Sequence, residues 1–211
     1  MKIKLPEKFL PRLIMTLLGV IICAIAVGFF KNSLFGVDPF QCFAQGSYAR
    51  FFSGVGYGTY YMGVSLILLV AVLFLDKHYI GLTTVINLFF TGYVVDFASN
   101  YIAISLPYPT LFMRAIMLLI GIVVMCFASS LYMTSDLGVS VYDAIPIIIS
   151  KRTGRQFRLM RICSDLICVI IGAICGLLPG IGTLITAFFM GPLIDFFNRK
   201  FSEPLLAKFK A

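Results

Sequence analysis

The chain has 211 residues, of which 60% are hydrophobic and only 12% are charged, and its formal net charge is +8. Soluble domains carry about 25% charged and about 45–50% apolar residues, so a water-soluble fold of this composition would lack polar side chains to cover its surface. The basic residues lie mostly in short loops and tails, which membrane topology explains without a nucleic-acid partner. The sequence therefore predicts an all-α polytopic protein of the lipid bilayer.

Six apolar runs follow one another along the chain. Leu13 to Phe30 holds no charge across 18 residues, and Ala115 to Ser135 holds none across 21. About 20 apolar residues are needed to cross the hydrocarbon as a helix, and a helix satisfies its own backbone hydrogen bonds there. The predicted spans are about 11–30, 56–75, 81–97, 110–132, 158–178 and 182–197.

Two further segments, 38–52 and 140–151, are too short to cross a bilayer and too apolar to lie free in water. They predict short helices that are either interfacial or re-entrant. Asp38 before Pro39 is typical of an N-cap, and Ser140 is the corresponding cap of the second helix. In transporters, such N-termini face anionic groups, although Asp38 already occupies one of them here. The residues that mark these ends are Gly36, Asp38, Gly138, Ser140 and Asp143.

The first run has an alternative interpretation as a signal peptide. Basic residues precede it, and Ala24-Ile25-Ala26 resembles a small-residue cleavage site. The apolar run continues through Phe30, however, and the same pattern recurs in mid-chain, where no signal peptide lies. We therefore expect a retained helix.

The second half of the chain repeats features of the first at an offset of about 100 residues. Paired Arg, Gly and Asp at steady offsets indicate a duplication. The matches include Arg12 with Arg114, Gly19 with Gly121, Gly36 with Gly138, Phe40 with Tyr142, Thr84 with Thr183, and Asp96 with Asp195. We predict repeat 1 at about 11–104 and repeat 2 at about 110–200, within a single membrane domain spanning 1–211, with a cytoplasmic tail at 201–211.

Each predicted repeat has three spans, so the second repeat should enter the membrane from the opposite side. Charge placement tests this, because cytoplasmic segments collect Lys and Arg. With the N-terminus inside, only Lys31, Arg50 and Arg114 fall outside. The inside set is Lys2, Lys4, Lys8, Arg12, Lys77, Lys151, Arg152, Arg155, Arg158, Arg161, Arg199, Lys200, Lys208 and Lys210. Both termini are predicted to be cytoplasmic.

Several motifs resemble those of the bacterial YczE/YitT-type (YczE/YyaS/YitT) membrane proteins. They are Gly36-Val37-Asp38-Pro39-Phe40, its partner from Gly138 to Asp143, and two Phe-Phe-x-Gly-x-x-x-Asp-Phe endings. The chain is similar to the short YczE-like form, because it lacks the soluble C-terminal domain of longer members. The first copy has Gln41 where the second has Asp143. The resemblance implies a multi-pass protein of the bacterial cytoplasmic membrane and names no substrate.

Charged residues at the span ends predict two ion pairs between the halves. Asp96 and Arg114 should meet at the outer side, and Asp195 and Arg12 at the inner side. Membrane-embedded charges are costly and usually have a partner or a function. These charges either fasten the two halves as pairs, act as gates that open when one pair breaks, or are simply exposed at the membrane interface.

Polar residues within the spans are candidates for a solute path. Thr84, Asn87 and Thr91 follow one helix face, and Thr183 and Thr186 repeat the first two. The alternative role is hydrogen bonding between helices.

Charges in and before the fifth span have two interpretations each. Asp165 lies one turn after Arg161, which predicts an i,i+4 pair or a proton or cation site. The basic segment 151–155, with Arg158 and Arg161, either touches anionic lipid head groups or only sets topology.

The favoured function is a small-solute transporter or permease that works by alternating access between inverted repeats, with an unknown solute. The alternative is a non-transporting component, such as a solute-capture subunit of a larger complex. The sequence is also compatible with a homodimer.

No enzyme is predicted, because no nucleophile–base pair or carboxylate cluster is evident. The six cysteines lack CxxC spacing and His78 is the only histidine, so no metal site and no cofactor is predicted.

Overall fold

The computed structural model describes residues 9–209, excepting the side chains of residues 57, 58, 92, 93 and 96. This part of the chain is helical throughout, with short connections. The α-helices are α1 (Phe9–Ser33), α2 (Pro39–Phe51), α3 (Tyr57–Leu75), α4 (Leu82–Ser105), α5 (Leu111–Ser135), α6 (Val141–Thr153), α7 (Phe157–Ile174), α8 (Ile181–Phe197) and α9 (Glu203–Lys208). A 3-10 turn, η1 (Lys77–Tyr79), follows α3, and a π-helical segment, η2 (Asn198–Ser202), joins α8 to α9.

The six predicted apolar runs coincide with α1, α3, α4, α5, α7 and α8, but three boundaries were wrong. Helix α4 continues to Ser105, because no helix breaker precedes Pro107. Helix α7 ends at Ile174, before Gly176, which has φ +98°. Helix α8 continues through η2 into α9, so most of the predicted tail is helical.

The exterior of the fold suits lipid. Within the described residues, three helices are long and apolar enough to cross a membrane: Phe9–Ser33, Leu111–Ser135 and Ile181–Lys208. Thr59–Leu75 and Leu82–Thr91 are shorter apolar helical segments. Large apolar side chains such as those of Phe74, Phe97 and Ile104 are exposed, which would be unfavourable in water. The chain is a multi-pass membrane protein in contact with the bilayer.

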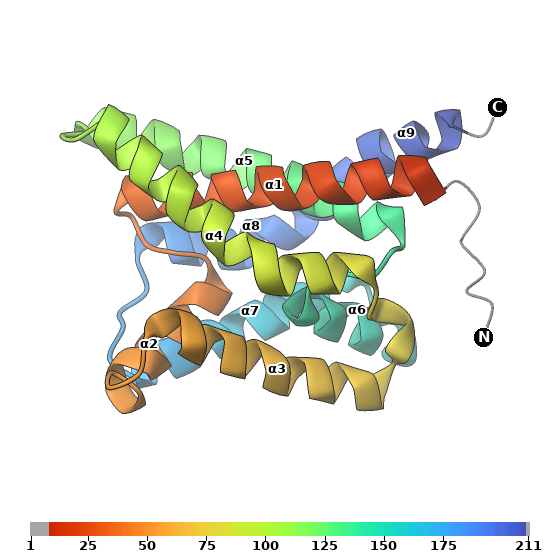
Figure 1. Cartoon of the computed structure of the whole chain (residues 1–211), viewed down its shortest axis with the longest axis horizontal. Helices are drawn as coiled ribbons and strands as arrows, with labels where there is room; N and C mark the ends of the chain where they lie inside the picture. Colours follow the sequence, from red (N-terminus) through yellow and green to blue (C-terminus); the bar gives the residue numbers. More distant parts are fainter. Residues whose placement is uncertain (1–8, 210–211) are drawn as a thin grey trace.

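Helix α1 packs against α4 and α5, and these three helices lie on one side of the bundle (Figure 1). Helices α2, α3, α6 and α7 form the opposite side of the bundle in the same view, with α2 packed on α7. Apolar side chains of α1, α5 and α8, among them Phe30, Leu118 and Met190, form one buried cluster.

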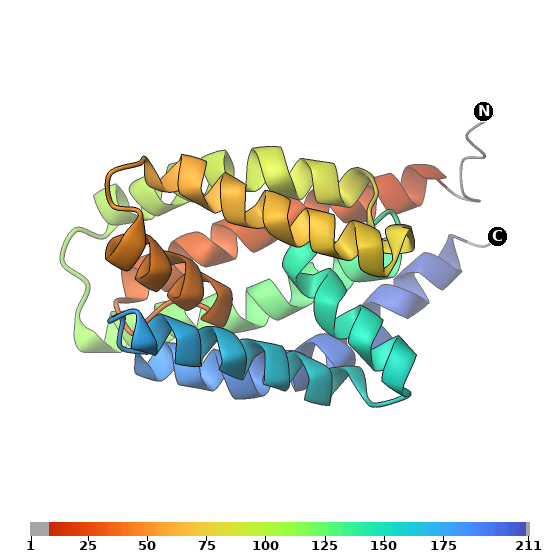
Figure 2. The ribbon, with the colours of Figure 1, turned by 90° about the horizontal axis from the view of Figure 1, so that it is seen from below.

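The two short helices α2 and α6 begin near the middle of the bundle and run toward opposite ends (Figures 1 and 2). Before each helix the chain turns at a glycine with positive φ, +119° at Gly36 and +96° at Gly138, a conformation that a Cβ would strain. Asp38 caps α2 as predicted: its Oδ1 accepts a hydrogen bond from the N–H of Gln41 at 3.2 Å. Ser140 precedes α6 without a side-chain cap.

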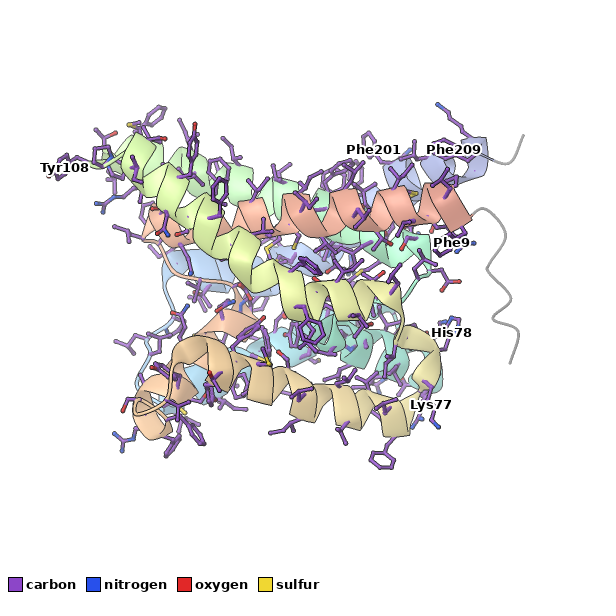
Figure 3. The ribbon with its side chains drawn as sticks, viewed as in Figure 1. Phe9, Lys77, His78, Tyr108, Phe201 and Phe209 are labelled. Atoms are coloured by element: carbon purple, nitrogen blue, oxygen red, sulfur yellow. The ribbon has the colours of Figure 1, made fainter. Side chains whose placement is uncertain are left out.

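The two ends of the described part of the chain lie at the same end of the bundle (Figure 3). Phe9 and Phe209 are found at the same end of the bundle as Lys77 and His78, while Tyr108 lies at the opposite end (Figure 3). The predicted inside residues Lys2, Lys4, Lys8 and Lys210 lie outside the described residues.

Candidate functional site

The chain segment before α2 is held by the N-terminus of α8. The carbonyl of Phe35 accepts a hydrogen bond from the N–H of Gly182 at 2.8 Å, and the carbonyl of Val37 accepts one from Thr183 Oγ1 at 2.7 Å. A Cβ at Gly180 would stand 2.0 Å from the Phe35 oxygen. Only glycine allows the two backbones to approach so closely at this point.

The segment before α6 is held by the N-terminus of α4 in the same way. The carbonyl of Leu137 accepts from the N–H of Thr83 at 3.0 Å, and the carbonyl of Val139 accepts from Thr84 Oγ1 at 2.7 Å. A Cβ at Gly81 would stand 2.2 Å from the Leu137 oxygen. These two loop–helix contacts fix where α2 and α6 begin.

A buried charge cluster lies beside the start of α6. Arg161 of α7 donates from Nη1 to Asp143 of α6 and from Nε to Asp165, at 3.2 Å in the second case. Tyr132 donates to Asp143, and Tyr142 donates to Asp165. Arg161, Asp143 and Asp165 are 4%, 5% and 0% exposed. One guanidinium therefore serves two buried carboxylates, each of which also accepts from a tyrosine.

Aromatic rings surround the point where α2 and α6 meet. The rings of Phe40 and Tyr142 stack with their centroids 4.7 Å apart and their planes 20° apart. Arg161 lies over the Tyr142 ring at 4.8 Å, and the Tyr61 ring meets that of Phe40 edge-on at 5.7 Å. The first turns of the two short helices are thus joined by ring contacts.

A cavity of about 100 Å³ opens beside these rings. Its polar lining residues come from α1, α3, α4, α5, α7 and the starts of α2 and α6. The polar lining residues are Cys23, Asp38, Gln41, Tyr61, Ser65, Thr84, Asn87, Thr91, Ser129, Tyr132, Ser140, Tyr142, Asp143 and Arg161. A polar cavity between membrane helices, close to the N-termini of two short helices, is suited to holding a small polar solute.

The N-termini of the short helices do not present free positive ends to this cavity. Asp38 caps α2 from the residue before its first turn, and Asp143 lies in the first turn of α6. A carboxylate at a helix N-terminus offsets the partial positive charge of the helix dipole. The expected role of these ends in binding an anion is therefore disfavoured by the chain's own carboxylates.

The five residues predicted to line a solute path separate into two groups in the structure. Thr84, Asn87 and Thr91 of α4 line the cavity, and Thr91 Oγ1 donates to Asn87 Oδ1 at 3.0 Å. Thr183 and Thr186 of α8 are not among the described residues that line it: Thr183 holds Val37, and Thr186 donates to carbonyls of its own helix. A solute path along the α4 residues stays a prediction, while the two α8 threonines make hydrogen bonds to backbone carbonyls instead.

The predicted pair of Arg12 with Asp195 was wrong. Arg12 Nη1 donates to the carbonyl of Ser135 at 2.8 Å and lies 3.6 Å from Asp136, because α1 packs against the C-terminal end of α5. Asp195 pairs instead with Arg199, one turn later on its own helix, at 3.1 Å. Arg12 and Asp195 each pair with a residue that lies nearer than the partner predicted from the topology.

The second predicted pair, Asp96 with Arg114, stays a prediction. The side chain of Asp96 lies outside the described residues. Arg114 is partly buried, and its Nε has no hydrogen-bond partner among the described residues.

Only some of the basic residues predicted to contact lipid head groups, 151–155 with Arg158 and Arg161, are available for such contacts. Arg161, expected among its head-group contacts, is buried in the charge cluster, so that expectation was wrong. Arg152 donates to the carbonyl of Leu75 at the end of α3, as a cation at a helix C-terminus is expected to do. The i,i+4 pair of Arg161 with Asp165 was predicted correctly.

Three contacts of the buried charge cluster were not predicted from the sequence. The contact of Arg161 with Asp143 joins two helices, and neither Tyr132 nor Tyr142 was expected to donate to a carboxylate. The available signal was the strong amphipathicity of α7, whose buried positions include Arg161 and Asp165. Charges on the buried face of a membrane helix require partners on neighbouring helices. Within the described residues, no group of three His, Cys, Asp or Glu side chains suits a metal ion.

Comparison with known proteins gives two matches. Residues 10–199 match a family described as "Family of unknown function (DUF6198)". An uncharacterized protein of Haemophilus influenzae is 25% identical over 181 residues, which cover 86% of this chain and 80% of that protein. No solved structure matches.

Proposed function

The chain belongs to the DUF6198 family, whose function is unknown, and we propose that it is a small-solute transporter whose solute occupies the central cavity. The observation that carries the proposal is the cavity of about 100 Å³, lined by both polar and apolar side chains, where α2 and α6 meet inside a membrane protein. Polar groups are rare in the membrane interior and usually mark a solute or ion path.

The proposal includes six membrane spans arranged as two inverted repeats, in a bacterial cytoplasmic membrane with both termini cytoplasmic. Matched residues make matched contacts, which supports this symmetry. A Cβ at Gly19 would meet Tyr132 and Ala128 of α5, and a Cβ at Gly121 would meet Phe30 and Ala26 of α1. The resemblance to YczE/YitT-type proteins belongs to the same proposal.

The two loop–helix contacts are the proposed gates. The contact of Val37 with Thr183 lies between the end of α1 and the start of α8, and the contact of Val139 with Thr84 lies between the end of α5 and the start of α4. In an inverted pair, one contact faces each side of the membrane. Alternating access then consists of opening one contact while the other stays closed.

Thiol labelling tests this mechanism without knowledge of the solute. In a background without the natural cysteines, Ser140→Cys places a thiol on the cavity wall. A membrane-impermeant thiol reagent should modify it when added from either side of sealed vesicles. A chain that retains only Cys126, which is 0% exposed, is the control that should stay unmodified.

Cross-linking then assigns each gate to one side. A short bifunctional thiol reagent joining Val37→Cys to Thr183→Cys should abolish labelling from the outside only, and one joining Val139→Cys to Thr84→Cys should abolish it from the inside only. Access from a single side in all variants would contradict alternating access and is the result expected of a solute-capture subunit.

A further inference from the structure

We infer that the cavity binds a compact organic cation, a small protonated or quaternary amine, whose charge is held by Asp38. This inference rests on the proposed transport function for its biological meaning, but it concerns binding alone. It depends on charge balance, on aromatic walls and on cavity size.

Among the buried carboxylates of Asp38, Asp143 and Asp165, only that of Asp38 has no salt bridge to a described cationic side chain. Asp38 lines the cavity and is 8% exposed. Among the described residues no cationic side chain pairs with it, and Arg161 is already engaged by Asp143 and Asp165. The N–H of Gln41 donates to Asp38, and the N-terminus of α2 offsets part of the Asp38 charge, but neither supplies a full positive charge. A buried carboxylate is costly unless it is paired, so this cavity favours a positive ligand.

The walls next to Asp38 favour an organic cation. Phe40, two residues later, and Tyr61 line the same cavity, whereas the Tyr142 ring is already in contact with Phe40 and Arg161. Aromatic faces attract ammonium groups through the ring quadrupole and are used to recognise quaternary amines. Hydroxyl and amide groups of Ser140, Asn87 and Thr91 supply acceptors for a protonated amine.

The size of the cavity limits the ligand. Its volume of about 100 Å³ lies well below the roughly 300–1,000 Å³ of sites for drug-sized ligands. The ligand is therefore an amine with few heavy atoms.

Ligand-induced thermal stabilisation of the purified full chain tests the inference, because a ligand that binds the folded state raises its stability. The probes are methylammonium, ethanolamine and tetramethylammonium, with acetate, urea, Na⁺ and K⁺ as comparison solutes at equal ionic strength. At least one of the amines should stabilise the protein, and acetate and urea should not.

The matched variant is Asp38→Asn, because Asn caps helices as well as Asp does but removes the charge. The affinity for the amine should fall at least about tenfold, as expected when one partner of a buried charge pair is lost. Asp76→Asn, which changes another N-cap carboxylate away from the cavity, should leave the affinity unchanged. Phe40→Leu should weaken tetramethylammonium binding.

Failure of the inference and failure of transport are separable. Stabilisation by acetate, by urea or by Na⁺ alone, the absence of stabilisation by every amine, or equal affinity in Asp38→Asn and the natural chain would each overturn the inference. Amine binding that depends on Asp38 would uphold it even if proteoliposomes showed no amine uptake, a result that would count against the transport function alone.

Discussion

The rings of Phe40 and Tyr142, which the proposed repeats place at corresponding positions, stack on each other with their centroids 4.7 Å apart. Each residue lies in the first turn of a short helix that begins near the middle of the bundle (Figure 2). A symmetry axis between two inverted halves brings equivalent residues together where it passes through the fold. The stack therefore marks the place at which such an axis is expected, next to the cavity.

Arg161 is expected to be the most important single charge for stability. Arg161→Met leaves Asp143 and Asp165 without their cation, and loss of one partner from a buried ion pair costs about 3–5 kcal/mol. The unfolding midpoint in detergent should fall accordingly. Arg199→Gln, which breaks the more exposed pair with Asp195, should cost less than about 1 kcal/mol. Equal effects of the two substitutions would contradict the buried cluster.

The close backbone contacts at Gly81 and Gly180 predict a matched pair of destabilised variants. Gly81→Ala and Gly180→Ala each place a Cβ within 2.2 Å of a carbonyl oxygen, and overpacking of this kind costs about 1–3 kcal/mol. Gly54→Ala meets nothing within 4 Å and should be nearly neutral. Thermal unfolding of the three variants measures the difference. If Gly180→Ala did not lower the unfolding midpoint, the close contact of Gly180 with the Phe35 carbonyl would be contradicted.

The two threonines that hold the loops are expected to behave alike. Thr84→Val and Thr183→Val each remove a 2.7 Å hydrogen bond to a carbonyl, and an unsatisfied buried group costs about 1–3 kcal/mol. The exposed Thr59→Val is the control. A large loss in one variant with none in the other would argue against equivalent roles.

Membrane topology is open to direct measurement. Cysteines introduced at Pro107 and at Arg152 should be labelled from opposite sides of the membrane, because the connection 106–110 and the end of α6 lie at opposite ends of the bundle (Figure 1). The position at Arg152 should be cytoplasmic, as its basic neighbourhood predicts. Labelling of both from the same side would rule out inverted halves.

The predicted pair of Arg114 with Asp96 can be tested by charge reversal. Arg114→Glu should lower the thermal stability, and the added Asp96→Arg should restore part of it if the two side chains pair. Reversal of Arg12 provides the contrast: Arg12→Glu should be rescued by Asp136→Arg, its observed neighbour at 3.6 Å, and not by Asp195→Arg. Absence of any rescue at position 96 would remove the Asp96–Arg114 pair from the proposal.

The sequence by itself determined which segments are helical. In lipid, apolar runs must satisfy their backbone hydrogen bonds internally, so the six long helices, the cap at Asp38 and the i,i+4 contact of Arg161 with Asp165 follow from local order. Only the tertiary structure decided which helix faces meet. The contact of Arg161 with Asp143, the pairing of Arg12 with Asp136 and the stack of Phe40 on Tyr142 depend on how each helix is rotated and placed. That rotation is set by packing between helices, because the surrounding lipid is as apolar as their side chains and gives little preference.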